Sequence, residues 1–239
     1  MKSIFFPEST RGKSDYGWLK TSYSFSFSNY WDDNRVHFGA LRVLNDDFID
    51  AGQGFGMHPH ENMEIITIPL TGALQHQDST GGKGIISAGE VQIMSAGSGL
   101  QHSEMNASKT EAVTLFQIWI FPKEKNIKPR YDQKMFDVVD RESKLQTVVS
   151  PKENSDSLWI NQNSWISLIQ LKPNENYTYN LNDSSNGVYI MLIDGSASIE
   201  TQQLERRDAV GIFETEHVHV NPISDCYIIF IEVPMVFSA

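Results

Sequence analysis

The sequence predicts an all-β protein made of two barrels in tandem, and three observations support this prediction. The apolar runs are short, rich in Val, Ile, Phe and Tyr, and separated by Gly, Asn, Asp and Ser, a pattern typical of strands. A helical period of apolar residues is hard to find along the chain. A polar stretch with several prolines, residues 121–153, separates two strand-rich halves. With 239 residues, 40% of them hydrophobic, the chain is long enough to bury a substantial core.

The clearest strand candidates are seven apolar runs. In chain order they are residues 36–43, 63–70, 91–94, 113–121, 165–171, 188–193 and 227–233. The two halves echo each other weakly, because residues 65–72 and 188–195 both read as a strand followed by a glycine turn. We therefore expect a duplicated β unit, divided into domains 1–132 and 133–239.

Charge and cysteine content narrow the function classes. The chain has 30 acidic and 19 basic residues, and its formal charge of −11 opposes attraction to phosphate backbones or anionic lipids. We expect no direct binding of nucleic acid. No apolar run approaches the roughly 18 residues of a membrane helix, so we expect no membrane association. The single cysteine, Cys226, lies in an apolar run and suits a reducing compartment, which predicts a cytoplasmic protein.

Histidines cluster in the first half of the chain. His58 and His60 are two residues apart, so in a strand both imidazoles face the same side, and Pro59 favours an extended backbone there. The same spacing puts His102 and Glu104 on one face of another extended segment. If the two segments face each other, they form a site of three nitrogens and one oxygen. Such a site suits Fe, Mn, Co, Ni, Cu or Zn and leaves positions open for substrate or oxygen.

These residues resemble the motifs of the cupin superfamily. The first cupin motif, a glycine followed by His-x-His and a glutamate, is matched by Gly52, His58, His60 and Glu64. In the second motif Ser95 replaces the usual proline, while Gly97, His102 and Asn106 are recognisable. Within the superfamily the chain most resembles the pirins, and especially the bacterial pirin-like quercetinases. The segments that carry this resemblance are residues 11–12, 17–19, 24–30, 41–43, 45–47, 51–56, 58–60, 64–65, 76–79, 88–90, 92–97 and 129–131.

The resemblance implies a bicupin, with two cupin (jelly-roll) β-barrels in tandem. It implies one divalent metal ion in the N-terminal barrel, bound by His58, His60, His102 and Glu104, and a degenerate C-terminal cupin without metal ligands. We favour Fe(II), with Zn, Co, Mn, Ni or Cu as alternatives, and we expect no organic cofactor.

Bacterial members of this family cleave the heterocycle of quercetin with O2 and release CO. The resemblance therefore implies a quercetin 2,3-dioxygenase-like oxygenase that acts on an aromatic, flavonol-like substrate. One alternative is a noncatalytic metal-binding pirin that regulates a protein partner, as eukaryotic nuclear pirins are described to do, and another is a cupin isomerase or hydrolase. Fold alone does not choose between these roles. We expect a monomer, because two packed barrels are self-sufficient.

Two carboxylates compete for the role of base. A flavonol 3-hydroxyl must lose its proton before the ring reacts with oxygen, and both Glu104 and Glu64 are candidates to accept it. The general cupin motif makes Glu64 the metal ligand, whereas the pirin pattern transfers that role to Glu104, which we predict as ligand and base.

Three further histidines have open roles. His76 either lines the pocket or satisfies a backbone group. His217 and His219 form another same-face pair, which we interpret as the polar end of a strand rather than a second metal site.

Overall fold

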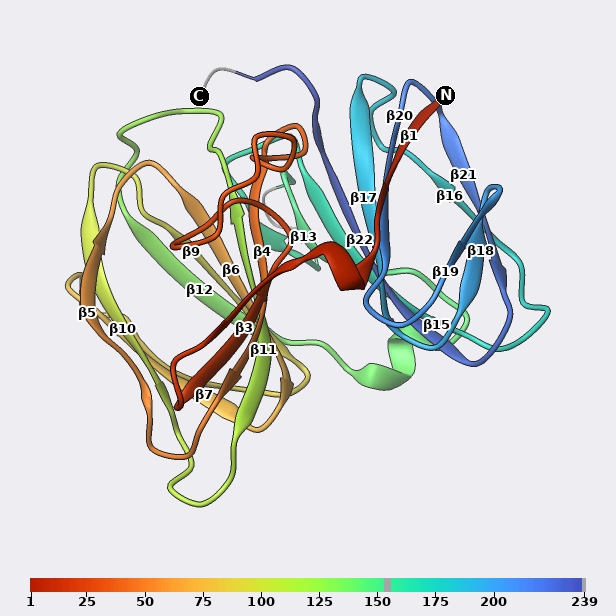
Figure 1. The fold of residues 1–239 in the computed structure, drawn as a ribbon. Helices are drawn as coiled ribbons and strands as arrows, with labels where there is room; N and C mark the ends of the chain where they lie inside the picture. The colour runs from red at the N-terminus through yellow and green to blue at the C-terminus, as the bar shows by residue number, and fades with distance from the viewer. Residues whose placement is uncertain (153–155, 238–239) are drawn as a thin grey trace.

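The structure of the chain, a computed structural model, describes residues 1–152 and 156–237. Within these residues the strands form four sheets, one of seven and one of four strands in each half of the chain. The helical segments there are two short 3-10 turns, η1 (Glu8–Thr10) and η2 (Val138–Arg141), and no helix in the described chain is long and apolar enough to cross a bilayer. The predicted all-β fold of two barrels is therefore confirmed, and the two halves lie side by side (Figure 1).

The first half is a sandwich of a large and a small antiparallel sheet. The large sheet runs in the order β12 (Arg130–Met135), β9 (Glu90–Ser95), β6 (Glu64–Thr71), β11 (Val113–Ile120), β4 (Leu41–Ile49), β3 (Leu19–Tyr23) and β2 (Gly12–Asp15). The small sheet runs in the order β5 (Gly54–His60), β10 (Leu100–Asn106), β7 (Ala73–Asp78) and β8 (Lys83–Ser87).

The second half repeats this plan, with one parallel pair of strands at the edge of its large sheet. Its large sheet runs in the order β1 (Lys2–Phe6), β20 (Ala209–Phe213), β17 (Asn186–Asp194), β22 (Cys226–Pro234), β15 (Trp165–Leu171), β13 (Gln146–Ser150) and β14 (Leu158–Trp159). Its small sheet runs in the order β16 (Tyr177–Asn180), β21 (His217–Pro222), β18 (Ala197–Ile199) and β19 (Gln202–Leu204). The amino-terminal strand β1 thus completes the sheet of the other half, and Figure 1 shows it in red beside β20.

The largest core lies between the two large sheets. One buried cluster contains Ile66 and Ile118 from the first half together with Ile166 and Ile229 from the second. Alternation along each strand explains this, since every second side chain of a strand faces the same side. Each large sheet therefore presents one apolar face to the other half and one face to the inside of its own barrel.

The insides of the two barrels differ in chemistry. The second barrel is filled by one continuous apolar cluster, in which Tyr179 stacks on Phe230 with ring centroids 4.6 Å apart. The first barrel has two smaller apolar clusters, around Leu115 and around Ile65. Buried polar residues of the first barrel include His102 and Glu104. Polar groups in a barrel interior need hydrogen-bond partners or ligands. We therefore expect a ligand site in the first barrel.

One predicted strand is displaced in the structure. The run 36–43 is wrong for its first five residues, because β4 begins at Leu41 and continues to Ile49. Gly39 has a φ of +50° where the chain turns, and Phe38 is buried against Tyr189, with ring centroids 5.9 Å apart. The second part of β4 is largely polar, so a search for apolar runs did not detect it, yet it pairs with β11 and β3.

The junction predicted between residues 132 and 133 falls inside a strand. β12 pairs with β9 of the first barrel from Arg130 to Met135. η2 follows this strand and leads into β13 of the second barrel. We propose that the junction lies after Met135, with β1 as a strand that the first half contributes to the second.

Candidate metal centre

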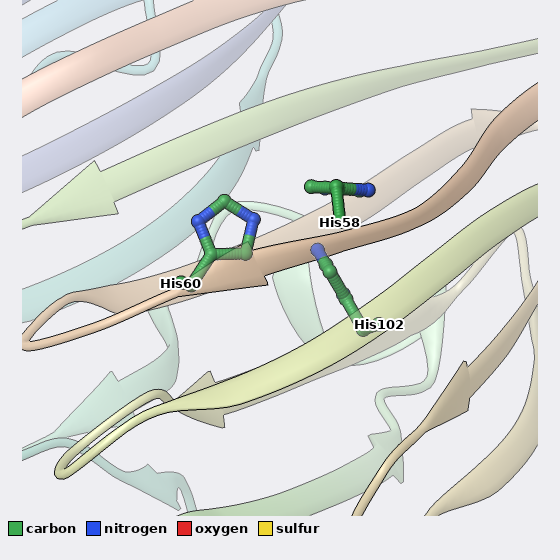
Figure 2. A group of neighbouring side chains, drawn as sticks. All are labelled: His58, His60 and His102. Carbon is green, nitrogen blue, oxygen red and sulfur yellow. The ribbon is translucent and has the colours of Figure 1, made fainter.

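Three histidines from two neighbouring strands point toward one another. β5 carries His58 and His60, and β10 carries His102, which pairs directly with His58 in the antiparallel ladder. The same-face spacing of residues 58 and 60 therefore brings both rings to the side on which His102 stands, as Figure 2 shows. Ring centroids are 4.4 Å apart for His58 and His102, 4.7 Å for His60 and His102, and 4.9 Å for His58 and His60.

The three rings fit a single metal ion. Each offers one ring nitrogen, and these nitrogens all lie within 4.8 Å of one another. Nitrogens bound at about 2.0–2.1 Å to one ion in a tetrahedral site lie about 3.4 Å apart, so each pair of rings needs to close by at most about 1.4 Å. Both ring nitrogens of His102, a residue that is 1% exposed, lack a hydrogen-bond partner within residues 1–152 and 156–237. A buried imidazole without protein partners is the expected state of a metal ligand.

The protonation states of the rings suit metal binding. Burial and the neighbouring His58 lower the pKa of His60 to about 4, and burial together with His58 and His60 lowers the pKa of His102 to about 2. Both rings are therefore neutral at pH 7 and keep a lone pair for a cation. His58 Nδ1 donates a hydrogen bond to the Gly56 carbonyl at 2.7 Å, which leaves the lone pair of its Nε2 available for a cation.

Glu104 lies beside the histidines, and two side chains form hydrogen bonds with its carboxylate. Gln117 Nε2 donates to Glu104 Oε2 at 2.8 Å, and the Thr67 hydroxyl is 3.2 Å from Glu104 Oε1. A carboxylate oxygen of Glu104 lies within 4.8 Å of nitrogens of His102 and His76. Burial raises the pKa of Glu104, while Gln117, His76 and Thr67 oppose that shift. The structure thus brings the predicted ligands into one region, with Glu104 nearest to His102 among them.

His76 supports this region from β7 rather than lining the cavity. Its Nε2 donates to Asp78 Oδ2 at 3.1 Å, and its ring stacks on Tyr131 with centroids 4.5 Å apart. Its ring also lies 5.3 Å from that of His102. Its partner is therefore a carboxylate side chain, which differs from both roles that the sequence left open.

Glu64 faces away from the histidines. It shares one side of β6 with Ile66, whereas Thr67, which contacts Glu104, is on the other side. The Glu64 carboxylate accepts hydrogen bonds from Ser95 Oγ at 2.8 Å and from the Asn161 backbone N–H at 3.2 Å. Burial raises the pKa of Glu64 to about 7, and these two hydrogen bonds oppose the shift. The carboxylate lies at the junction of the two halves.

A cavity of about 430 Å³ opens over the three histidines. Trp18, Phe27, Phe55 and Trp119 form its aromatic walls. Its polar lining consists of Asn45, Asp47, His58, His60, His102, Glu104 and Gln117. An apolar cavity of a few hundred Å³ with convergent polar groups on one side is typical of a small-molecule site.

The pair in the second barrel has different surroundings. His217 and His219 are exposed on β21, and Thr178 Oγ1 lies 3.1 Å from His219 Nδ1. Among the described residues, both clusters of potential metal ligands belong to the first barrel.

Several cavity residues were missed from the sequence. Gln117 stands as a lone amide in the apolar strand β11, and this interruption is a signal that could have found it. Asn45 and Asp47 lie in segment 45–47, whose resemblance to the pirins is a signal that could have found them.

Family models match both halves of the chain. The model described as Pirin matches residues 6–120, and the model described as Quercetinase C-terminal cupin domain matches residues 147–233. Together they cover most of both barrels.

Relatives of known name match nearly the whole chain. A quercetin 2,3-dioxygenase of Escherichia coli is 41% identical over 226 residues, which cover 95% of this chain and 96% of the relative. The crystal structure of the bacterial pirin YhhW from Escherichia coli, in complex with nickel(II), superposes with a TM-score of 0.92 at 39% identity and covers 98% of this chain and 100% of that one. A quercetin 2,3-dioxygenase from Acinetobacter baumannii shares the fold, with a TM-score of 0.78 at 17% identity. The chain is therefore a metal-binding bicupin that belongs to the pirin family.

Proposed function

We propose that this chain is a metal-dependent quercetin 2,3-dioxygenase, which opens the heterocycle of a flavonol with O2 and releases CO. The observation that carries this proposal is the cluster of His58, His60 and His102 at one side of an aromatic cavity of about 430 Å³. That volume and lining suit a flat aromatic substrate. The name of the Escherichia coli relative supports the same activity.

The metal ligands we propose are His58, His60, His102 and Glu104. Three imidazoles and a carboxylate accept several divalent ions, and we propose Fe(II) as the resident ion. Nickel is the first alternative, because the similar pirin from Escherichia coli was crystallised with it. The bound ion would supply Lewis-acid stabilisation of the substrate's deprotonated 3-oxygen beside O2.

Glu104 is the base in this proposal. One of its carboxylate oxygens accepts the proton of the flavonol 3-hydroxyl, which makes the ring electron-rich enough to react. Burial raises the pKa of Glu104 and so strengthens it as a base. Gln117 and Thr67 hold the carboxylate in place. We assign the base role to Glu104 rather than Glu64, because Glu104 lines the cavity whereas the Glu64 carboxylate faces the junction of the halves, where it binds Ser95 and Asn161.

The aromatic walls position the substrate and exclude water. Trp119 packs edge-on against both His60 and Phe27, with centroids 4.9 and 5.3 Å apart. Trp18 and Phe55 pack against each other at 5.3 Å on another part of the wall. These rigid walls orient a planar ring system over the histidines. In the overall reaction both oxygen atoms of O2 enter the ring-opened product, and the carbon that carried the 3-hydroxyl leaves as CO.

Loss of quercetin absorbance, with CO detection, tests the proposal. Metal-reconstituted protein should consume quercetin and O2 in equal amounts and release an equal amount of CO, while a folded His58→Ala variant should not. His217→Ala is the matched control, because this exposed histidine belongs to the pair in the second barrel. Protein that is inert with Fe, Mn, Co, Ni, Cu and Zn would contradict the assignment. It would favour a noncatalytic pirin that regulates a protein partner.

The monomeric state, a protein partner and the cytoplasmic location remain predictions. Size-exclusion chromatography with light scattering tests the first of these.

A further inference from the structure

A second chamber lies beside the cavity over the histidines. This side chamber has a volume of about 240 Å³ and shares Trp18, Phe27, Asn45, Asp47 and Phe55 with the main cavity. Its remaining lining includes the hydroxyl-bearing side chains of Tyr16, Thr21, Tyr23 and Ser28. The shared wall residues make the two spaces neighbours, so one ligand with two ring systems can occupy both.

Asn45 and Asp47 stand where the two chambers meet. They are alternate residues of β4 and line both spaces, so their side chains face the same side of the strand. They are 4% and 6% exposed. Within the described part of the chain, neither Asn45 Oδ1 nor Asp47 Oδ1 has a hydrogen-bond partner, although the Thr21 hydroxyl is near enough to Asp47 to lower its pKa.

Such buried acceptors call for an explanation. The large majority of buried side-chain polar atoms in proteins are hydrogen-bonded, because an unpaired one costs free energy. The next residue, Asp46, shows the contrast, since its Oδ2 accepts a hydrogen bond from Arg207 Nε at 2.7 Å. A ligand that donates hydrogen bonds would satisfy both free acceptors.

The chemistry of a flavonol supplies such donors. Its pendant aryl ring is attached to the carbon next to the one that carries the 3-hydroxyl. When that hydroxyl is held at the histidines, the pendant ring is therefore directed to an adjoining space. Phenolic hydroxyls on this ring are donors, and a carboxylate and an amide oxygen are their complementary acceptors.

We infer that Asn45 and Asp47 determine substrate specificity, by binding the hydroxylated pendant ring of the flavonol in the side chamber. This inference rests on the proposed function, because it takes the flavonol as substrate. A site built to bind a hydroxyl rejects the analogue that lacks it, since its own polar groups then stay unpaired.

Two matched flavonols test the inference. Quercetin carries two hydroxyls on its pendant ring, and galangin has the same fused rings with an unsubstituted pendant ring. Binding to metal-reconstituted protein under nitrogen is measured by calorimetry, and kcat/KM and CO release are measured in air. The wild-type chain should bind quercetin about 10- to 100-fold more tightly than galangin, the range for two hydrogen bonds to buried acceptors.

The variants Asn45→Leu and Asp47→Asn should each reduce this preference at least about fivefold, mainly by weakening quercetin binding. Asn45→Leu is the safer variant for folding, because it removes an amide whose oxygen has no partner in the described chain. The control is Asp194→Asn, an exposed aspartate that pairs with Arg206 at 3.4 Å. It should leave the preference unchanged.

The outcomes separate the inference from the proposed function. A preference that is the same in wild type and both variants, or an equal loss of affinity for both flavonols, overturns the specificity role. A wild type that releases no CO from either flavonol overturns the dioxygenase, whereas the binding ratio still decides whether the subsite exists.

Discussion

At the scale of single residues, the chemistry of this protein depends on polar side chains at inward positions of apolar strands. Gln117 and Thr67 are such residues, and both hold the carboxylate of Glu104. Glu104 is 3% exposed, so water does little to solvate its charged form. Its hydrogen-bond partners and the adjacent metal ion together would stabilise the ionised form that a base requires.

Replacing Glu104 with Gln should abolish most of the activity. The amide neither accepts the substrate proton nor binds a divalent ion as a charged ligand, so we expect kcat/KM to fall about 100-fold or more. Turnover of quercetin and metal content per chain measure the two effects. Glu64→Gln is the comparison and should keep turnover close to wild type. Full activity with full metal content in Glu104→Gln would refute the role of Glu104.

Replacing Gln117 with Leu should slow the reaction without loss of the metal ion. The change removes the hydrogen bond of 2.8 Å to Glu104, while His58, His60 and His102 stay in place. Supporting residues of a metal site typically contribute 10- to 100-fold, and we expect a loss of about 10-fold in kcat. Metal content should stay near one ion per chain. A kcat equal to that of wild type would show that Gln117 does not position the carboxylate.

At the scale of elements, the ladder between β5 and β10 builds the site. His102 pairs with His58, and a register shift between His102 and Glu104 then places Glu104 opposite Phe55. Gly54 allows this close pairing, because a Cβ there would collide with the Glu104 carbonyl and the Cα of Met105. Its φ of +157° also lies at the edge of the region that favours glycine.

Gly54→Ala should therefore disturb the pairing of β5 and β10. Because the obstructing atoms belong to the backbone, we expect a loss of about 1–3 kcal/mol in the free energy of unfolding and weaker metal binding. Gly56→Ala, two residues along β5, is the matched control, since nothing lies within 4 Å of a Cβ at that position. Urea denaturation and metal titration of both variants measure the difference. Equal stability of the two variants would argue against this packing constraint.

At the scale of the whole molecule, the two sandwiches form a single packed body. Their large sheets share one apolar core, and β1 of the first half completes the sheet of the second. Polar contacts add to this junction. Arg207 Nε and Asp46 Oδ2 form an ion pair of 2.7 Å, and the Asn161 N–H donates to Glu64. The second half thus supports the strands that carry the site.

The buried carboxylate at this junction predicts how stability depends on pH. Burial raises the pKa of Glu64 from 4.5 to about 7, so the folded state binds a proton more tightly than the unfolded state does. This contribution to stability is complete below about pH 4.5 and is lost as the pH rises through 7. At about 1.4 kcal/mol per pKa unit, the loss is about 3 kcal/mol.

Urea denaturation of metal-free protein between pH 5 and pH 8 measures this effect. Glu64→Gln carries no titrating carboxyl there, so its stability should fall less steeply with pH than that of the wild type. Asp47, whose pKa burial also raises to about 7, contributes to the slope of both proteins. Glu214→Gln, at an exposed ion pair with Lys2, is the control and should follow the wild type. Identical slopes for wild type and Glu64→Gln would contradict the prediction.

Much of the fold could be read from local patterns. The run 165–171 coincides with β15, and the runs around β6, β11, β17 and β22 agree within a few residues. The spacing of His58 and His60 placed both rings on one side because the two-residue period of a strand is a local property. The resemblance to the cupin and pirin motifs also predicted the family of the chain, and the family models and relatives confirm it.

Local patterns do not say which side of a strand faces the barrel. Glu64 and Thr67 are close in β6, yet one reaches Asn161 of the other half and the other reaches Glu104. Asn45 and Asp47 lie outside the predicted apolar runs, yet they line the cavity, because β3 and β11 pair with β4 on either side. The sequence alone therefore specified the strands and the histidine pairs, through short-range periodicity. The assembly of the sheets determined which carboxylate meets the histidines and which polar residues line the cavity, because pairing register and sheet packing depend on residues far apart in the chain.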